Sequence, residues 1–175
     1  MSDKMRWITV LSLLVVLAAA GWLYLANRTP AAPTAAPLLS SHLVDLAGIR
    51  QPLRQWSGQV LVINFWASWC VPCQQQMDQI RLWHTDPSAR QVEVISIALD
   101  DRAAVQRFVT SHHIDWPVLF GDVETFNSMR QLGDHKDSLP FAAVIGADGR
   151  ILATRSGAID RSWLQAHVPI VTHQR

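Results

Sequence analysis

Near the middle of this 175-residue chain, a buried strand, a pair of cysteines and a helix follow one another without interruption, and few folds accommodate that order. Residues 60–66, VLVINFW, form a continuous apolar run that is typical of a strand buried on both faces of a parallel sheet. Residues 92–99, VEVISIAL, have the same character. Between the two runs, apolar side chains recur at the period of a helix, namely Cys73, Met77, Ile80 and Trp83. Strand, helix and strand in this order predict a right-handed βαβ unit with parallel strands.

The second half of the chain continues the alternation of helices and strands. The pattern predicts helices over 101–112, 123–132 and 160–168, and strands over 116–120, 142–145 and 150–154. The last two strands flank an Asp148-Gly149 pair, which signals a tight hairpin and therefore antiparallel strands. A small additional hairpin is expected over residues 43–56. Together these elements predict a three-layer α/β domain with a mixed central sheet.

The cysteine pair, Cys70-Val71-Pro72-Cys73, lies where the first strand ends and the helix begins. The unpaired N–H groups of a first helical turn carry a partial positive charge, which stabilises a thiolate and lowers the pKa of Cys70 below about 8.5. Cys73 lies three residues further along, on the same helical face and deeper in the domain. We therefore expect Cys70 to be the attacking nucleophile of disulfide exchange and Cys73 to be the resolving thiol.

Other uses of two cysteines explain this spacing less well. A structural disulfide that closes a four-residue loop stabilises a fold by only about 2 kcal/mol, against about 4.7 kcal/mol for a hundred-residue loop. A zinc site needs four ligands, and a c-type haem needs a His after the second Cys, where this chain has Gln74. Cu(I) binding by the two thiolates is an open alternative. The motif beside a βαβ pattern favours redox chemistry, with no metal and no cofactor other than the disulfide itself.

The N-terminal segment has a different character from the rest of the chain. Residues 7–26, WITVLSLLVVLAAAGWLYLA, contain no charge, and as a helix they span about 30 Å, the thickness of a bilayer core. This predicts a membrane anchor over residues 1–28, with a signal peptide cleaved near 18–20 as the alternative. Lys4 and Arg6 precede the segment, which predicts a single-pass inner-membrane protein with a cytoplasmic N-terminus and a periplasmic or other extracytoplasmic domain.

Residues 29–37, TPAAPTAAP, are rich in Pro and Ala and predict a linker, so the globular domain is expected over 38–175. The chain has 15 Lys and Arg against 14 Asp and Glu, a net charge of +1. Such a balance gives no support to nucleic-acid binding, because proteins that bind nucleic acids usually carry a basic patch.

The segment 64–73, NFWASWCVPC, resembles the active-site stretch of the TlpA-like and ResA-like thiol–disulfide oxidoreductases, which are membrane-anchored relatives of thioredoxin. The resemblance extends through most of residues 42–168. Three further segments support it and occur in the same order as in that family: residues 58–64, 139–145 and 148–151. The resemblance implies a thioredoxin fold and an extracytoplasmic domain that passes reducing equivalents to protein disulfides. It also implies a membrane electron-donor protein as a second partner.

The resemblance assigns roles around the cysteines as well. It implies that the bond before Pro140 is cis, that Pro140 packs beside Cys70, and that the backbone of Leu139 pairs with an extended substrate. Trp69 is expected at the exposed rim of the pair, where it can contact substrate. The Val71-Pro72 dipeptide between the cysteines resembles reductases more than strong oxidants, which favours reduction.

The stretch after the second cysteine departs from the family pattern twice, at Gln76 and in the absence of the Pro that members often have soon after it, where this chain has residues 77–79, MDQ. Many members carry an acidic residue three positions after the second cysteine, where this chain has Gln76, so membership of the cytochrome c maturation branch does not follow. The amide cannot titrate, so proton transfer to Cys73 is expected to use water or another group. Asp78 is expected to be a solvated surface acid. The alternative function is a non-catalytic tethered module that carries copper or acts as a chaperone.

Overall fold

The N-terminal part of the chain forms a unit of its own. The computed structural model describes residues 3–26 and 33–169, and it divides the chain into one unit that ends at Ala32 and another that begins at Pro33. The first unit contains one described helix, α1 (Asp3–Ala26). Across both described ranges, no helix combines the length and the apolar character needed to cross a membrane. The anchor expected over residues 1–28 stays a prediction from the sequence.

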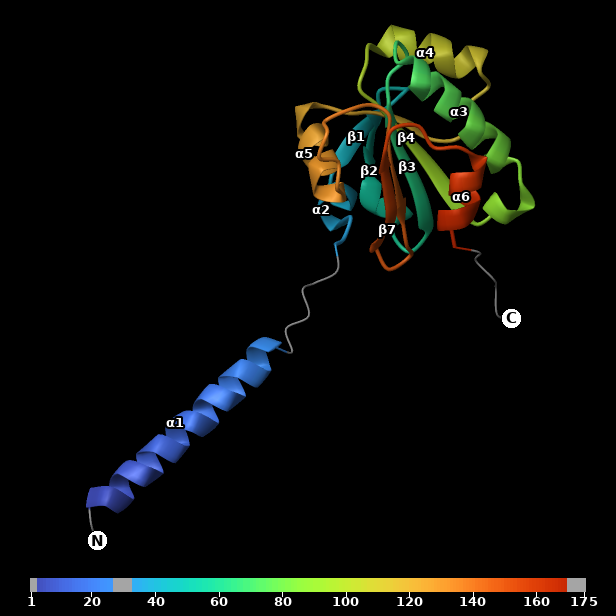
Figure 1. Cartoon of the computed structure of the whole chain (residues 1–175). Coiled ribbons are helices and arrows are strands. Elements are labelled where there is room, and N and C mark those ends of the chain that lie inside the picture. Colours follow the sequence, from blue (N-terminus) through green and yellow to red (C-terminus); the bar gives the residue numbers. More distant parts are fainter. Residues whose placement is uncertain (1–2, 27–32, 170–175) are drawn as a thin grey trace. The chain divides into compact units, whose positions relative to one another are not determined.

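The second unit is built on a seven-stranded sheet with the strand order β2-β1-β5-β4-β3-β6-β7 (Figure 1). The strands are β1 (His42–Asp45), β2 (Arg50–Pro52), β3 (Val60–Trp66), β4 (Val92–Ala98), β5 (Val118–Phe120), β6 (Phe141–Ile145) and β7 (Ile151–Ser156). The helices are α2 (Ala36–Leu39), α3 (Val71–His84), α4 (Arg102–Ser111), α5 (Val123–Leu132) and α6 (Arg161–His167), with short 3₁₀ turns at Leu53–Trp56 and Pro87–Ala89.

The strand pairing confirms the predicted βαβ unit and the mixed sheet. Strands β3 and β4 are parallel over their whole length, from the Val60–Val92 pair to the Trp66–Ala98 pair. Strand β6 is antiparallel to β3, and β7 is antiparallel to β6, as the Asp-Gly turn predicted. The early hairpin is confirmed as well, because β1 and β2 pair antiparallel and β1 also pairs antiparallel with β5.

Alternate residues of the strands face opposite sides of the sheet, and helices cover both sides (Figure 1). Helices α3, α4 and α6 cover the side that contains Val62, Trp66 and the two cysteines, which we call the cysteine face. Helices α2 and α5 cover the side that contains Leu61, Ile63 and Phe65, which we call the far face. Three layers are therefore present, as the sequence predicted.

The domain begins earlier than the predicted linker boundary. Ala35 is completely buried, its N–H donates to Gly149 O at 2.9 Å, and Ile151 N–H donates to Pro33 O at 3.1 Å. Residues 33–35 therefore pair with the β6–β7 hairpin, and residues 36 and 37 already belong to α2 instead of the linker. The prediction rested on the lack of large apolar side chains, but small residues bind a hairpin through their backbone groups. Residues 29–32 lie outside the described ranges.

Candidate active site

The cysteine pair lies at the carboxyl edge of the sheet, where the chain turns from β3 into α3. Strand β3 ends at Trp66, and Cys70 is the N-cap residue of α3. The Cys70 carbonyl accepts hydrogen bonds from Cys73 N–H at 2.9 Å and Gln74 N–H at 3.1 Å, which begins the helix. Pro72 lies in the first turn of α3, where backbone N–H groups have no acceptor within the helix, so the lack of an N–H in proline costs no helical hydrogen bond. The sequence predicted this local geometry.

The two cysteines form a disulfide and differ in accessibility. Cys70 and Cys73 are bonded, with their Cα atoms 5.2 Å apart. Cys70 is 6% exposed and Cys73 is completely buried. An incoming substrate therefore meets Cys70 first, which agrees with the expected roles of Cys70 as nucleophile and Cys73 as resolving thiol.

Two exposed apolar side chains flank Cys70. Trp69 is 69% exposed and Val71 is 61% exposed, although large apolar residues are usually covered in a folded domain. Trp66, in contrast, is completely buried and packs against Phe108, with ring centroids 4.9 Å apart. The structure thus places Trp69 at the rim, as expected, and keeps Trp66 in the core.

The Leu139–Pro140 segment lies at the same edge of the sheet as the cysteines. The bond between these residues is cis, as the resemblance implied. The register pairs Phe65 with Phe141, so Pro140 lies beside the end of β3, and Leu139 packs against the core of the cysteine face. Within residues 33–169, neither the N–H nor the C=O of Leu139 has a backbone partner. The Leu139 backbone is therefore available to pair with an extended peptide.

Asp100 holds the turn before the cysteines, a role that the sequence analysis missed. Its carboxylate accepts hydrogen bonds from Ser68 N–H at 2.7 Å and from the Ser68 hydroxyl. Partial burial raises the pKa of Asp100, but the hydrogen bonds from Ser68 and neighbouring amides outweigh it and hold the pKa below its usual value. The sequence signal that could have revealed this role is the position of Asp100 two residues after β4, because the carboxyl ends of adjacent parallel strands meet at one edge of the sheet.

A chain of buried polar side chains lies on the cysteine face. Trp116 Nε1 donates to Ser96 Oγ at 2.7 Å, and Ser96 Oγ donates to Asn64 Oδ1 at 2.6 Å. Asn64 Nδ2 in turn lies 3.3 Å from the sulfur of Met77, one helical turn after Cys73. Because Asn64 and Ser96 are both completely buried, each needs these partners to offset the loss of water.

Gln76, the residue that departs from the family pattern, is also completely buried. Its Oε1 accepts a hydrogen bond from Ile159 N–H at 2.9 Å, while its Nε2 has no partner among the described residues. Asp78 is a surface acid as expected, with its side chain 47% exposed and 3.8 Å from Arg81. Within residues 33–169, no group of three His, Cys, Asp or Glu side chains is arranged to hold a metal ion.

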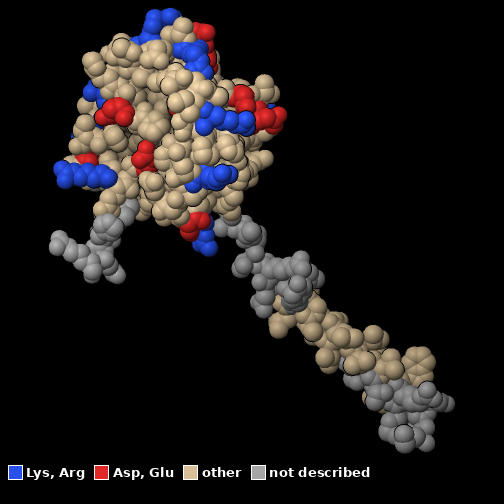
Figure 2. All heavy atoms as spheres, turned by 180° about the vertical axis from the view of Figure 1, so that it is seen from behind, with Lys and Arg blue, Asp and Glu red and all other residues tan. Residues whose placement is uncertain are grey.

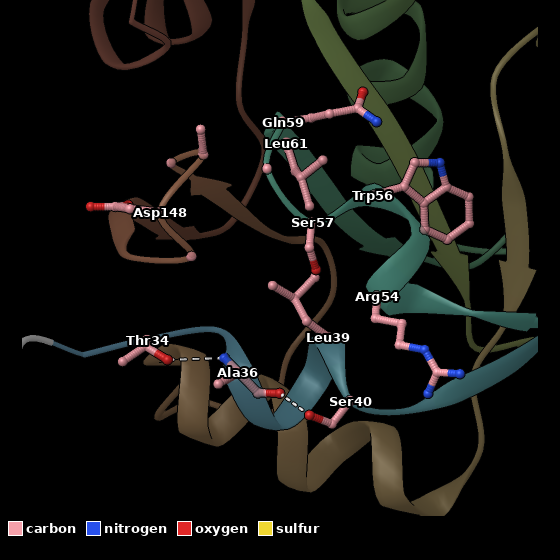
Figure 3. A pocket seen from close by; sticks show the side chains of 14 residues that line it. Thr34, Ala36, Leu39, Ser40, Arg54, Trp56, Ser57, Gln59, Leu61 and Asp148 are labelled. Atoms are coloured by element: carbon pink, nitrogen blue, oxygen red, sulfur yellow. Dashed lines mark hydrogen bonds between the residues drawn. The ribbon is translucent and has the colours of Figure 1, made fainter.

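A pocket of about 330 Å³ lies away from the cysteines. It is lined by Leu39, Ser57, Leu61 and the β6–β7 turn around Asp148 (Figure 3). Leu61 is near the start of β3, whereas Cys70 follows its end, so the pocket and the disulfide lie at opposite ends of this strand. The pocket is therefore not part of the candidate active site.

A family model described as Redoxin matches residues 31–168. The chain belongs to the Redoxin family. The thiol–disulfide oxidoreductase ResA of Halalkalibacterium halodurans is 23% identical over 172 residues, and the match covers 96% of this chain and 96% of that protein. ResA of Bacillus subtilis is 24% identical over 132 residues, which cover 74% of this chain and 70% of that protein. The family and these two relatives confirm the expected enzyme class: the chain is a thiol–disulfide oxidoreductase.

Solved structures confirm the thioredoxin-like fold. A secreted thiol-disulfide isomerase from Corynebacterium glutamicum matches with a TM-score of 0.66 at 24% identity, covering 75% of this chain and 83% of that one. A thiol:disulfide interchange protein from Chlorobium tepidum matches with a TM-score of 0.68 at 19% identity, covering 81% and 96%. At these identities the structural matches establish the fold alone.

Proposed function

We propose that this protein is a membrane-tethered, extracytoplasmic enzyme that reduces disulfide bonds in exported proteins. The observation that carries the proposal is the arrangement at one sheet edge: Cys70 is 6% exposed, Cys73 is completely buried, and the Leu139 backbone has no backbone partner within residues 33–169. The exposed side chains of Trp69 and Val71 add an apolar surface beside the sulfur that meets the substrate. A small disulfide needs no such surface, whereas an extended polypeptide can use both the surface and the free backbone groups.

The reaction is a pair of exchange steps that balance in electrons and protons. The Cys70 thiolate attacks one sulfur of the substrate, the substrate S–S bond breaks, and the released thiolate takes up a proton. The Cys73 thiolate then attacks Cys70, so that the mixed disulfide breaks and the second substrate thiol leaves. The enzyme ends as the Cys70–Cys73 disulfide found in the structure, and the substrate has gained two electrons and two protons. A dithiol donor protein in the membrane must then reduce the enzyme again.

The face of the domain shown in Figure 2 does not favour one sign of charge. On the face shown in Figure 2, acidic and basic side chains are interspersed over the domain with broad uncharged areas between them. Substrate selection in this proposal therefore depends on apolar contact and backbone pairing at the cysteine edge instead of long-range attraction. The tether rests on the uncharged run over residues 7–26 and on the basic residues that precede it.

The first experiment traps the intermediate of the exchange. Full-length Cys73→Ser is mixed with a disulfide-containing peptide and analysed by mass spectrometry without reductant. A mixed disulfide through Cys70 is expected, and full-length Cys70→Ser should give none. Absence of any adduct with Cys73→Ser would contradict the proposed chemistry. A module that acts only as a chaperone would bind the peptide equally well in both variants.

The second experiment fixes the direction of electron flow. The purified full-length protein is equilibrated in thiol redox buffers and its reduction potential is measured. A value near or below about −230 mV is expected for a reductase, whereas a value near about −120 mV would show an oxidant and reverse the proposal.

A third experiment tests the location. Added protease should digest the domain in intact spheroplasts, and the protein should stay in the membrane after carbonate extraction. Protection from protease in intact spheroplasts would contradict an extracytoplasmic domain.

A further inference from the structure

Two segments contribute the substrate-contacting groups, and a third segment touches both. The first is α3 with the cysteines, and the second, which we call the proline loop, is residues 134–140 between α5 and β6. The third, which we call the strap, is residues 156–160, from the last residue of β7 to the start of α6. Each of the first two segments is hydrogen-bonded to the strap, through groups that are distant in the sequence.

The proline loop is organised by the buried carboxylate of Asp134. This side chain is completely buried, which is rare for an acid that lacks several hydrogen-bond donors. It accepts from Lys136 N–H at 3.1 Å and from Ser138 N–H at 3.3 Å, two amides of the loop itself. It also accepts from the Ser156 hydroxyl of the strap at 2.8 Å. One carboxylate therefore shapes the loop and joins it to the strap.

The strap continues the connection to both sides of the active site. Gly157 N–H donates to Pro140 O at 2.8 Å, and Gly157 has a φ of 107°, a conformation that favours glycine. Two residues later, Ile159 N–H donates to the buried Gln76 Oε1 of α3. A continuous set of hydrogen bonds thus runs from the proline loop through the strap to the cysteine helix.

We propose that Asp134, Ser156 and Gln76 are positioning residues whose contacts with the strap fix the proline loop relative to Cys70. The proposal rests on the proposed function, because the loop presents the Leu139 backbone to an extended peptide. The sulfur atoms themselves are held by α3 and by the turn at Ser68, and among the described residues no hydrogen bond joins that turn to the proline loop. Loosening the loop therefore impairs peptide substrates and leaves disulfides without a peptide backbone unaffected.

The test compares two substrates with one set of full-length variants. The peptide substrate carries a disulfide within an extended segment, and the small substrate is bis(2-hydroxyethyl) disulfide, which has no peptide backbone. Asp134→Asn keeps the size of the side chain but replaces one acceptor oxygen by an NH₂ group. We expect its kcat/KM for the peptide to fall on the order of tenfold, mainly through KM, because a loosened loop must be ordered before its backbone can bind the peptide. Its rate with the small disulfide and its reduction potential should match the wild type.

Three further variants control this result. Asp148→Asn is the matched control, because the Asp148 carboxylate also accepts a backbone N–H, that of Arg150 at 3.0 Å, but in a turn away from the cysteines. This variant should behave as wild type. Ser156→Ala removes the strap contact with little change in the loop and should reproduce the selective loss if Asp134→Asn folds poorly. Gln76→Leu removes the hydrogen bond between the strap and α3. Its effect on the rate with the peptide should be less than additive with that of Asp134→Asn.

The outcomes separate the two proposals. Equal losses with both substrates, or no loss in Asp134→Asn and Ser156→Ala, would overturn the positioning role while leaving the reductase proposal intact. A wild type that reduces bis(2-hydroxyethyl) disulfide and fails with every peptide disulfide would instead overturn the proposed function.

Discussion

The cysteine face and the far face are built from alternate residues of the same strands, yet they differ in polarity. The central strand residues of the far face are aliphatic and aromatic, with Ile63 and Phe65 from β3 against Ile95 and Ile97 from β4. On the cysteine face, Asn64 and Ser96 occupy equivalent central positions and pair in register. Gln76 adds a third completely buried polar side chain there.

This difference shows where the domain tolerates buried polar groups. A buried amide or hydroxyl costs about 1–3 kcal/mol when it lacks a partner, so an apolar core is the cheaper way to stabilise a sheet. The far face follows that rule. The cysteine face departs from it below and beside the disulfide, where Gln76 Nε2 and Trp66 Nε1 have no partner among the described residues. We infer that the far face supplies stability and that the cysteine face is arranged around the site.

The largest expected effect comes from emptying the far face. Phe65 and Phe141 are completely buried with ring centroids 5.7 Å apart, so Phe65→Ala leaves a cavity that the sheet cannot close. We expect the free energy of unfolding to fall by about 3–5 kcal/mol, with no change in the reduction potential. Urea unfolding of the oxidised protein and equilibration in thiol buffers measure the two quantities. A loss below about 1 kcal/mol would contradict the close packing of this face.

A smaller loss is expected from the polar chain of the cysteine face. Ser96→Ala deprives Trp116 Nε1 of its acceptor and Asn64 Oδ1 of its donor, which should cost about 1–3 kcal/mol in urea unfolding. Ser128→Ala on α5 is the matched control, because within residues 33–169 its hydroxyl donates only to the Glu124 carbonyl of the same helix, at 3.3 Å. If the two variants lose the same stability, the buried chain does not stabilise the cysteine face.

The contribution of Asp100, beside the cysteines, to the free energy of unfolding should depend on pH. Because the pKa of Asp100 is lower in the folded protein than in the unfolded chain, the unfolded chain binds more protons between the two values. Stability from this group is present above about pH 4 and is lost as the pH falls through the folded pKa. Asp100→Asn should therefore flatten the loss of stability below about pH 4. Unfolding free energies of both proteins from pH 3 to 7 give the difference curve, and parallel curves would contradict the role of Asp100.

The smallest effect is expected at the outer surface of α3. Asp78 and Arg81 are half-exposed and 3.8 Å apart, and exposed ion pairs contribute little because water and salt screen them. Asp78→Asn should change the free energy of unfolding by less than about 0.5 kcal/mol and leave the exchange rate with a peptide disulfide unchanged. A reduced exchange rate would mean that Asp78 serves as the proton-transfer group that the sequence leaves unidentified.

Sequence patterns predicted the elements well where the signal is local. The strands at 60–66 and 92–99, the helix after Cys70 and the hairpin at Asp148-Gly149 all depend on period or turn chemistry within a few residues. The predictions were less accurate where a residue acts through a distant partner. Nothing close to Asp100 in the sequence indicates its partner: Asp101 caps α4, while Asp100 holds Ser68, 32 residues away. The linker boundary was misplaced because residues 33–35 gain their partners from the β6–β7 hairpin.

The sequence by itself determined the βαβ order, the place of the cysteines at a helix start and the identity of the two reacting thiols. Those features follow from the alternation of side chains and from the N–H groups of a first helical turn. Only the tertiary structure decided that Gln76 holds Ile159, 83 residues away, and that Asp134 holds Ser156, 22 residues away. Hydrogen bonds between such distant residues leave no periodic trace in the chain, because their geometry exists only after the sheet and its helices have packed.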